Sequence, residues 1–261
     1  MSGLVVLDSV SVRFGDAKVV DDVTFSVDAG EWFGVLGPNG AGKSTLLRTL
    51  VGGPIAAGSA SIGGRNMATT TGRARAGLVA YVPQRPQYPA GMAVFDFVLL
   101  GRTPHLGLLA AERSDDITAV WEALDALDLV AFAERDVASL SGGETQRVSM
   151  ARVIAQESPV LVLDEATAAL DIARQHQVLE LIDTVRTERG IAIVSAMHDL
   201  TAAAQFCDRV GVMDSGRLRG VGAPKEVMTE GLLCEVFEPT VRVIDVEGEQ
   251  VIVSMREKEP R

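Results

Sequence analysis

Apolar and polar positions alternate near the start of the chain, over residues 4–12 and again over residues 19–27. Alternation with a period of two is typical of a strand that buries one of its faces. The dipeptide Gly15-Asp16 between the two segments is suited to a turn. The pattern therefore predicts two half-buried strands joined by a turn, which we expect to belong to an antiparallel β subdomain.

Further along the chain, short apolar runs take turns with segments of helical spacing. The apolar runs predict strands at residues 32–36, 59–62, 77–82, 160–163, 191–195 and 210–213. Helical spacing occurs at residues 46–51, 174–187 and 200–207. Strands that alternate with helices predict a mostly parallel core sheet covered on both faces, so the expected fold class is α/β.

A second organisational feature is a long stretch without strand signals, from about residue 93 to residue 133, where the spacing is helical. We interpret residues 88–158 as a helical subdomain inserted into a main domain of residues 1–239. After Thr240, two alternating segments around Glu247-Gly248-Glu249 predict a β-hairpin, and residues 257–261 predict a disordered tail. Residues 240–261 are therefore expected to form a carboxyl-terminal extension.

Composition narrows the classes of function. The chain has 261 residues, of which 47% are hydrophobic, so it can bury a full core. The net charge of −11 and the pI near 4.8 argue against a nucleic-acid partner and against broad adhesion to anionic lipid. No apolar run approaches the ~18–20 residues that span a bilayer, so we expect no transmembrane segment.

The amino terminus and the cysteines point to a cytosolic protein. Residues 1–7 lack a basic region and Asp8 follows them directly, so we do not expect a signal peptide. Cys207 and Cys234 are too few for a disulfide framework or a metal cluster. We expect both to be reduced, packed thiols.

A phosphate-binding motif lies between a predicted strand and a predicted helix. Its sequence is Gly37-Pro38-Asn39-Gly40-Ala41-Gly42-Lys43-Ser44-Thr45, which fits the template G-x-x-x-x-G-K-[ST]. Glycines let backbone N–H groups turn inward around an anion. We expect Lys43 to reach the β- and γ-phosphates of a nucleoside triphosphate and Ser44 to ligate Mg²⁺.

Two acidic residues, Asp164 and Glu165, follow the apolar run at residues 160–163. A carboxylate at the carboxyl end of a buried strand near a phosphate loop is well placed to hold Mg²⁺. We assign Asp164 to the metal and Glu165 to accepting a proton from the water that attacks the γ-phosphate. Without the upstream phosphate loop, the same pair would more often be a solvated strand end.

A second glycine-rich segment, Leu140-Ser141-Gly142-Gly143-Glu144-Thr145-Gln146-Arg147, precedes a helical pattern. Ser141 has the character of a helix N-cap, and the glycines that follow leave backbone N–H groups open to an anion. The residues alone favour an ordinary N-cap. One triphosphate cannot easily occupy this helix end and the phosphate loop together, unless a second copy of the chain supplies one of them.

Taken together, the segments GPNGAGKST, LSGGE-QR and LVLDEAT-AALD resemble, in order and spacing, the ATP-binding subunit of ABC transporters. The resemblance covers nearly the whole chain and implies a P-loop NTPase fold of ABC type. It also implies that two subunits pack head to tail. Each ATP would then lie between the phosphate loop of one copy and Ser141, Gly142, Gly143 and Glu144 of the other.

The same resemblance assigns roles to four further residues. Gln84 matches the glutamine that touches Mg²⁺ and the attacking water and links the site to the membrane partner. Asp171 matches the aspartate that crosses the dimer interface, and His198 matches the histidine that contacts the γ-phosphate and orients Glu165. Phe14 stands where the family places an aromatic ring that stacks on adenine, which needs only a ring face.

Two histidines lie outside the motifs of the family, and three residues within the motifs differ from the usual ones. His105 and His176 match no functional position, so we expect them to be surface or packing residues. The three substitutions relative to the family pattern are Ala166 for proline, Ala168 for serine and Glu144 for glutamine. We expect activity to survive the changes at Ala166 and Ala168, which lie outside the reacting groups. A carboxylate facing a triphosphate is unfavourable, so we expect Glu144 to point elsewhere or to pair with a base such as Arg147.

Three parts of the sequence resemble importers of iron–siderophore, haem and cobalamin. They are Leu99-Leu100-Gly101-Arg102-Thr103-Pro104-His105-Leu106-Gly107, Leu170-Asp171-Ile172-Ala173 and the terminal strand pair. That resemblance implies separate permease subunits, whose short helix docks in a groove after Gln84, and an extracytoplasmic substrate-binding protein. The chain would then lie peripherally on the cytoplasmic face of the membrane. The alternatives are an importer of another small solute and a soluble ABC ATPase that acts on ribosomes or DNA. A P-loop kinase would explain neither LSGGE nor His198.

Overall fold

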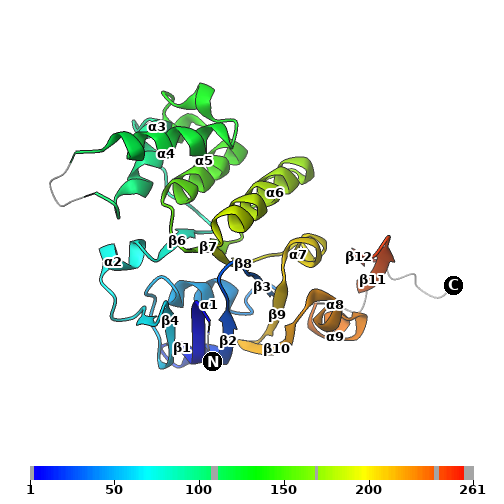
Figure 1. The fold of residues 1–261 in the computed structure, drawn as a ribbon. Helices are drawn as coiled ribbons and strands as arrows, with labels where there is room; N and C mark the ends of the chain where they lie inside the picture. Colours follow the sequence, from blue (N-terminus) through cyan, green and yellow to red (C-terminus); the bar gives the residue numbers. More distant parts are fainter. Residues whose placement is uncertain (1–2, 107–110, 168–169, 238–240, 256–261) are drawn as a thin grey trace.

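The computed structural model describes residues 3–106, 111–167, 170–237 and 241–255. Its centre is a six-stranded sheet in the order β10-β9-β3-β8-β7-β6 (Figure 1). The strands are β3 (Trp32–Leu36), β6 (Val79–Val82), β7 (Val160–Asp164), β8 (Ala192–Ala196), β9 (Arg209–Asp214) and β10 (Arg217–Gly222). All neighbours pair in parallel except β9 and β10, which confirms the predicted mostly parallel sheet.

A four-stranded antiparallel sheet, in the order β2-β1-β4-β5, forms the predicted second subdomain. Its strands are β1 (Val5–Phe14), β2 (Ala17–Val27), β4 (Ala57–Ile62) and β5 (Arg65–Asn66). The rings of Phe25 and Phe33 stack with their centroids 4.4 Å apart and join this sheet to the central one. The helix α1 (Lys43–Thr49) contributes Leu46 and Leu47 to the same buried cluster.

The predicted helical subdomain is present as short helices around a long one. It contains α3 (Val94–Leu99), η1 (Leu100–Arg102), α4 (Ser114–Asp125), η2 (Val130–Phe132), η3 (Val137–Ser139) and α5 (Gly142–Ala155). Arg102 holds three of these parts together. Its guanidinium donates to Asp116 of α4 at 2.9 Å, to the Ala155 carbonyl at 2.7 Å and to Glu157 at 2.6 Å. An additional methyl group on Gly101 would lie 2.3 Å from the carbonyl oxygen of Arg152, so glycine is required where η1 crosses α5.

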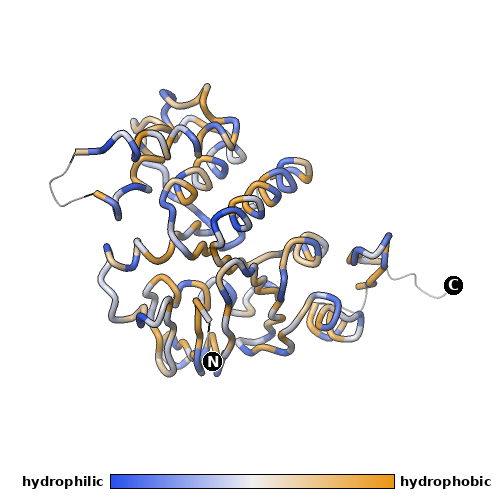
Figure 2. Tube along the Cα trace, viewed as in Figure 1, coloured by the Kyte–Doolittle hydropathy of each residue, from blue (hydrophilic) through white to orange (hydrophobic). Residues whose placement is uncertain are grey.

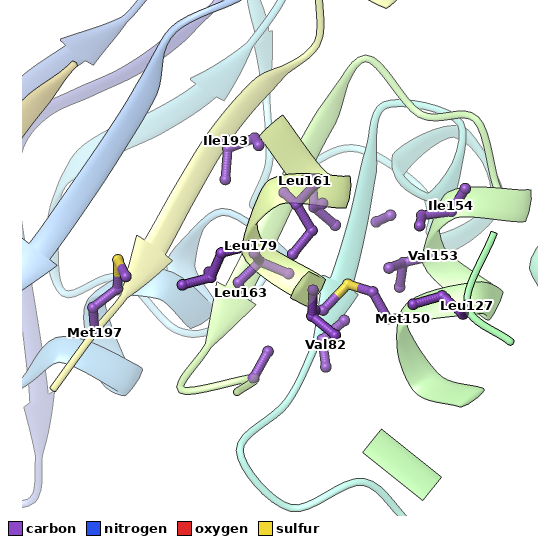
Figure 3. Close-up of a cluster of buried hydrophobic side chains, with 14 of the residues drawn as sticks. Val82, Leu127, Met150, Val153, Ile154, Leu161, Leu163, Leu179, Ile193 and Met197 are labelled. Atoms are coloured by element: carbon purple, nitrogen blue, oxygen red, sulfur yellow. The ribbon is translucent and has the colours of Figure 1, made fainter. Parts of the chain in front are cut away.

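The apolar core continues from the helical subdomain onto the central sheet. Figure 3 shows Met150, Val153 and Ile154 of α5 beside Leu161 of β7 and Leu179 of α6 (Ile172–Arg189). All five side chains are buried. Apolar and polar positions lie side by side along α6 (Figure 2), which covers the sheet with one face and meets water with the other. Burial on both faces explains why β7 and β8 are continuous apolar runs.

The remaining elements belong neither to these two sheets nor to the helical subdomain. They are α2 (Gly72–Ala76), α7 (Leu200–Phe206), α8 (Pro224–Val227), α9 (Glu230–Val236), β11 (Val241–Val246) and β12 (Glu249–Ser254). The predicted hairpin is confirmed as β11 paired with β12, and it rests on α7, where the Thr201 hydroxyl accepts from the Ile252 amide at 3.0 Å. The starting residue Thr240 and the predicted tail at residues 257–261 lie outside the described residues. Within the described ranges, no helix combines the length and apolarity that crossing a membrane requires.

Candidate nucleotide-binding site

Four neighbouring parallel strands bring the predicted site residues together at the carboxyl ends of the strands of the central sheet. The strand order β3-β8-β7-β6 places the loop after β3 beside His198 after β8, Glu165 after β7 and Gln84 after β6 (Figure 1). Parallel strands all end at the same edge, and ligands of open α/β sheets bind there. The fold therefore gathers residues that are far apart in the sequence.

The loop after β3 depends on its glycines. Gly37 has φ 150° and Gly42, which caps α1, has φ 101°. An added methyl group would lie 2.3 Å from the Met213 carbonyl oxygen at Gly37 and 2.6 Å from the Val19 carbonyl oxygen at Gly42. The backbone is pressed against β9 and β2 at these two points, so no larger residue fits.

A cavity of about 320 Å³ lies over this loop. It is lined by Val19, Asn39, Gly40, Ala41, Gly42, Lys43, Ser44, Thr45, Gln84 and Glu165. Val19 is a lining residue that the sequence did not indicate, because an apolar strand residue carries no chemical signal. Phe14 does not line the cavity. It lies at the end of β1 with 54% of its surface exposed, and its contact with adenine stays a prediction.

Lys43 is buried at the bottom of the loop. Its ammonium group donates to the carbonyl oxygens of Gly37 at 2.7 Å and Pro38 at 3.2 Å, and it lies 3.8 Å from a Glu165 carboxylate oxygen. Burial lowers the pKa of Lys43, and the carboxylates of Glu165 and Asp164 oppose that lowering. The lysine is thus a cation in a poorly hydrated place, which a phosphate would neutralise.

Asp164 and Ser44 meet as predicted for a Mg²⁺ site. Asp164 is fully buried, and its Oδ1 accepts a hydrogen bond from the Ser44 hydroxyl at 2.7 Å. Its Oδ2 accepts one from the Tyr81 hydroxyl at 3.1 Å. Oxygen donors of this kind suit Mg²⁺, and a buried carboxylate that receives hydrogen bonds from neutral hydroxyls is suited to a cation. The residues therefore fit the metal ion.

Tyr81 is a second residue that sequence reasoning missed. It pairs with Val162 across β6 and β7, so its side chain emerges on the same face as that of Asp164, two residues further along β7. Burial, followed by the nearby Asp164 carboxylate, raises the pKa of Tyr81 to about 12. The hydroxyl therefore stays protonated at neutral pH and remains a hydrogen-bond donor.

Glu165 is the centre of the cluster. His198 Nε2 lies 2.5 Å from its Oε1, and the Gln84 amide donates to its Oε2. The side chain is 7% exposed, and the backbone has φ 54°, in the left-handed region that a residue with a Cβ rarely adopts. Its amide donates to the Ala196 carbonyl at the end of β8, 3.1 Å away. Contacts from both flanking strands hold a strained residue in place, as is common at active sites.

Near the end of the glycine-rich segment at residues 140–147, Gln146 donates to the carbonyl of Ala166, the neighbour of Glu165. Ser141 is the N-cap of α5, as predicted, and neither it nor the glycines after it line the cavity over the phosphate loop. Glu144 Oε2 accepts from the Ser141 amide at 2.7 Å and from the Ser141 hydroxyl at 2.6 Å. These two hydrogen bonds lower the pKa of Glu144. Of the two expected alternatives, Glu144 therefore turns to its own N-cap residue, while the Arg147 guanidinium donates to the Leu127 carbonyl at 3.0 Å.

The other described residues named from the sequence lie outside the cavity over the phosphate loop. Asp171 is the N-cap of α6 and accepts from the Arg174 amide at 2.9 Å, with its side chain exposed. Ala166 is buried, and its carbonyl accepts from Gln146 of α5. His105 and His176 are exposed, which agrees with their prediction as surface residues. Ala168 lies outside the described residues.

This arrangement of fold and site is that of a P-loop ATPase, and a family model described as ABC transporter matches residues 20–168. The chain belongs to the ABC transporter family and carries its ATP-binding domain. The hemin import ATP-binding protein HmuV of Rhodococcus jostii is 38% identical to it over 98% of this chain and 89% of that protein.

Other relatives are similar to the same extent. The cobalamin import ATP-binding protein BtuD of Halobacterium salinarum is 39% identical over 90% of this chain and 58% of that protein. Among solved structures, a metal-chelate type ABC transporter in an inward-facing conformation superposes with a TM-score of 0.83. It covers 98% of this chain and 99% of the other, at 26% identity.

Proposed function

We propose that the chain binds Mg·ATP, hydrolyses it and thereby powers an importer whose permease subunits are separate chains. The observation that supports hydrolysis most directly is Glu165, held between His198 and Gln84 and 3.8 Å from Lys43. Phosphoryl transfer needs mainly positioning and neutralisation of charge, and this cluster has the groups for both.

Each group then has one task. Lys43 and the amides of residues 37–45 hold the β- and γ-phosphates, while Ser44, Asp164 and Gln84 hold Mg²⁺. When bound, the ion neutralises charge on the phosphate oxygens. Glu165 accepts the proton of the attacking water, and His198 keeps the carboxylate turned toward it. Phe14 stacks on the adenine ring.

The active form is a head-to-tail pair. Ser141 and Gly142 are exposed and do not reach the phosphate loop of their own chain, which supports their use in a second copy. Ser141, Gly142, Gly143 and Glu144 of one copy would close the ATP site of the other. Asp171, exposed at the start of α6, would cross the same interface.

The permease would dock on the helical subdomain beside Gln84. A hollow of about 130 Å³ lies there between the segment after β6, with Pro86 and Gln87, and the helices that carry Phe97 and Arg152. Because Gln84 is only two residues before Pro86, docking at this place bears directly on the catalytic cluster. The chain would then be peripheral to the cytoplasmic face of the membrane.

Relatives named for hemin and cobalamin import support a proposal for the cargo class. We propose an iron–siderophore, haem or cobalamin as cargo, delivered to the permease by an extracytoplasmic substrate-binding protein. The alternatives are an importer of a metal ion or other small solute and a soluble, non-transport ABC ATPase. Tagged chain purified from solubilised membranes would carry a multi-span permease if the transport proposal holds, and ribosomes or DNA if it is wrong.

Hydrolysis is tested with Glu165→Gln. This change removes the base but keeps the shape, so we expect ATP binding to be retained and the ATPase rate to fall by roughly 10²–10⁴-fold. A matched control is Glu180→Gln, since Glu180 is 62% exposed on α6 and lies away from the site. Phosphate release under saturating Mg·ATP gives the rate. Full turnover by Glu165→Gln would remove Glu165 from the proposed role.

A further inference from the structure

Tyr81 has a contact that the hydrolysis scheme does not use. Its hydroxyl donates to Oδ2 of Asp164 at 3.1 Å, while Ser44 donates to Oδ1 of the same carboxylate at 2.7 Å. Asp164 is fully buried. The two hydroxyl donors come from different elements, β6 and α1, and they fix the two oxygens of the carboxylate on either side.

We propose that Tyr81 is a positioning residue for the metal ion, which sets the orientation of the Asp164 carboxylate toward Mg²⁺. This inference rests on the proposed function, in which Asp164 and Ser44 hold the ion. With Oδ2 occupied by the tyrosine, the carboxylate cannot rotate freely about its terminal bond. Oδ1 stays directed at Ser44, where the ion is expected. Hydrogen-bonding partners of a ligating carboxylate tune the affinity of a metal site in this way.

The chemical nature of the donor also matters. A lysine or arginine in place of Tyr81 would neutralise the carboxylate and repel a divalent cation. A neutral hydroxyl orients Asp164 and leaves its negative charge available to the metal. An apolar side chain would leave Oδ2 buried without this donor, so the carboxylate would lose the contact that holds it in the orientation for Mg²⁺.

The position of Tyr81 in the sheet makes the orientation rigid. Its backbone lies in β6, paired in register with Val162 of β7, and Asp164 is the last residue of β7. Neither group is on a loop. Groups carried by strands hold their separation better than groups carried by loops, which is a property of sites that must bind a small ion at fixed distances.

The test is Tyr81→Phe, which removes the hydroxyl and keeps the ring that packs against the sheet. The probe is Mn²⁺, followed by electron paramagnetic resonance, with the full chain saturated by the non-hydrolysable analogue AMP-PNP. We expect Mn²⁺ affinity to fall about tenfold, the lower end of what loss of a partner of a metal ligand costs. Affinity for AMP-PNP measured in EDTA should be unchanged, because no phosphate contact is lost.

The matched control is Tyr88→Phe. Tyr88 is the other tyrosine of the chain, and its hydroxyl bonds to Ser149 and to the Thr145 carbonyl, both at 2.8 Å, within the helical subdomain. It should keep the Mn²⁺ affinity of the parent.

Equal Mn²⁺ affinity in Tyr81→Phe and the parent would overturn the inference. A joint loss of Mn²⁺ and metal-free AMP-PNP affinity would overturn it too, since that result describes a general structural role. If the parent itself bound neither probe, the proposed function would fail, and that result is distinguishable because it appears before any substitution is made.

Discussion

Cys207 shows how closely single side chains are fitted around the phosphate loop. It follows α7, and its sulfur lies 3.7 Å from the sulfur of Met197, just before His198. A methyl group added to Gly34 of β3 would lie 2.7 Å from the Cys207 sulfur. The thiol therefore fills the space that glycine leaves in the strand leading to the loop. Burial, and to a smaller degree the Asp208 carboxylate, raises the pKa of Cys207.

This raised pKa predicts a loss of stability at alkaline pH. The unfolded thiol loses its proton above its ordinary pKa of 9.0, while the folded thiol keeps it. The stabilising contribution is therefore intact below pH 9.0 and falls above it, by up to about 1.4 kcal/mol per pH unit. Urea unfolding at about pH 8 and about pH 10 measures the change. The free energy of unfolding of Cys207→Ala should fall less between the two pH values than that of the parent. An equal change in the free energy of unfolding between the two pH values in Cys207→Ala and in the parent would contradict the prediction.

At the scale of elements, the helical subdomain is held by one buried charged residue. The Arg102 side chain is 7% exposed and that of Asp116 is 5% exposed, and the pair joins η1 to α4. The same guanidinium bonds to the end of α5 through the Ala155 carbonyl. This clamp gives the sequence segment around Arg102 a structural role, separate from the cargo class that its resemblance implies.

Removing only the arginine of the buried ion pair between Arg102 and Asp116 should lower the free energy of unfolding. Arg102→Met leaves the Asp116 carboxylate buried without its partner, so we expect the free energy of unfolding to fall by about 3–5 kcal/mol. Circular dichroism during urea unfolding measures it. The control is Arg219→Met, because Arg219 forms an ion pair with Asp214 at 2.7 Å on the surface, and such pairs contribute about 0–1 kcal/mol. The double change of Arg102→Met with Asp116→Leu should recover part of the loss, and no recovery would argue against a buried unpaired charge.

The strands that the sequence predicted well include the continuous apolar runs of the central sheet. The runs at residues 160–163 and 191–195 are buried except for the half-buried Ile191, and they appear as β7 and β8 with ends shifted by at most one residue. β10, α8 and α9 were missed, because β10 has only intermediate and exposed positions and the two helices are short. Motif residues could be named from their order, but Tyr81 could not, since its contact with Asp164 depends on the register of β6 against β7. Side-chain partners such as that of Glu144 likewise depend on local geometry.

At the scale of the whole molecule, the proposed head-to-tail pair would need two halves of a site that lie on different subdomains of one chain. Ser141 caps α5 in the helical subdomain, and Lys43 begins α1 beside the central sheet. A pair of chains related by a twofold axis would satisfy both halves twice, which is how an isologous interface is built.

The pair should form when ATP cannot be hydrolysed. Glu165→Gln at saturating Mg·ATP is expected to have the mass of a dimer by static light scattering. Adding Ser141→Arg should return it to a monomer, because a long cationic side chain would stand where the second ATP site must close. Ser114→Arg, in the first turn of α4, is the control and should leave the dimer intact. A dimer that persists in the Ser141→Arg double variant would contradict the head-to-tail arrangement.

The two connections of the helical subdomain have a mechanical consequence. One leaves the carboxyl end of β6, and the other returns through residues 156–159 to the amino end of β7. Because β6 and β7 are parallel neighbours, the two attachment points lie at opposite ends of this pair of strands. A line through the two attachment points runs along the strands, so a rotation of the helical subdomain about that line would move Ser141 and leave the phosphate loop in place. Gln84 follows the attachment at β6 and its amide donates to Glu165, so the same rotation would also act on a residue that holds Glu165.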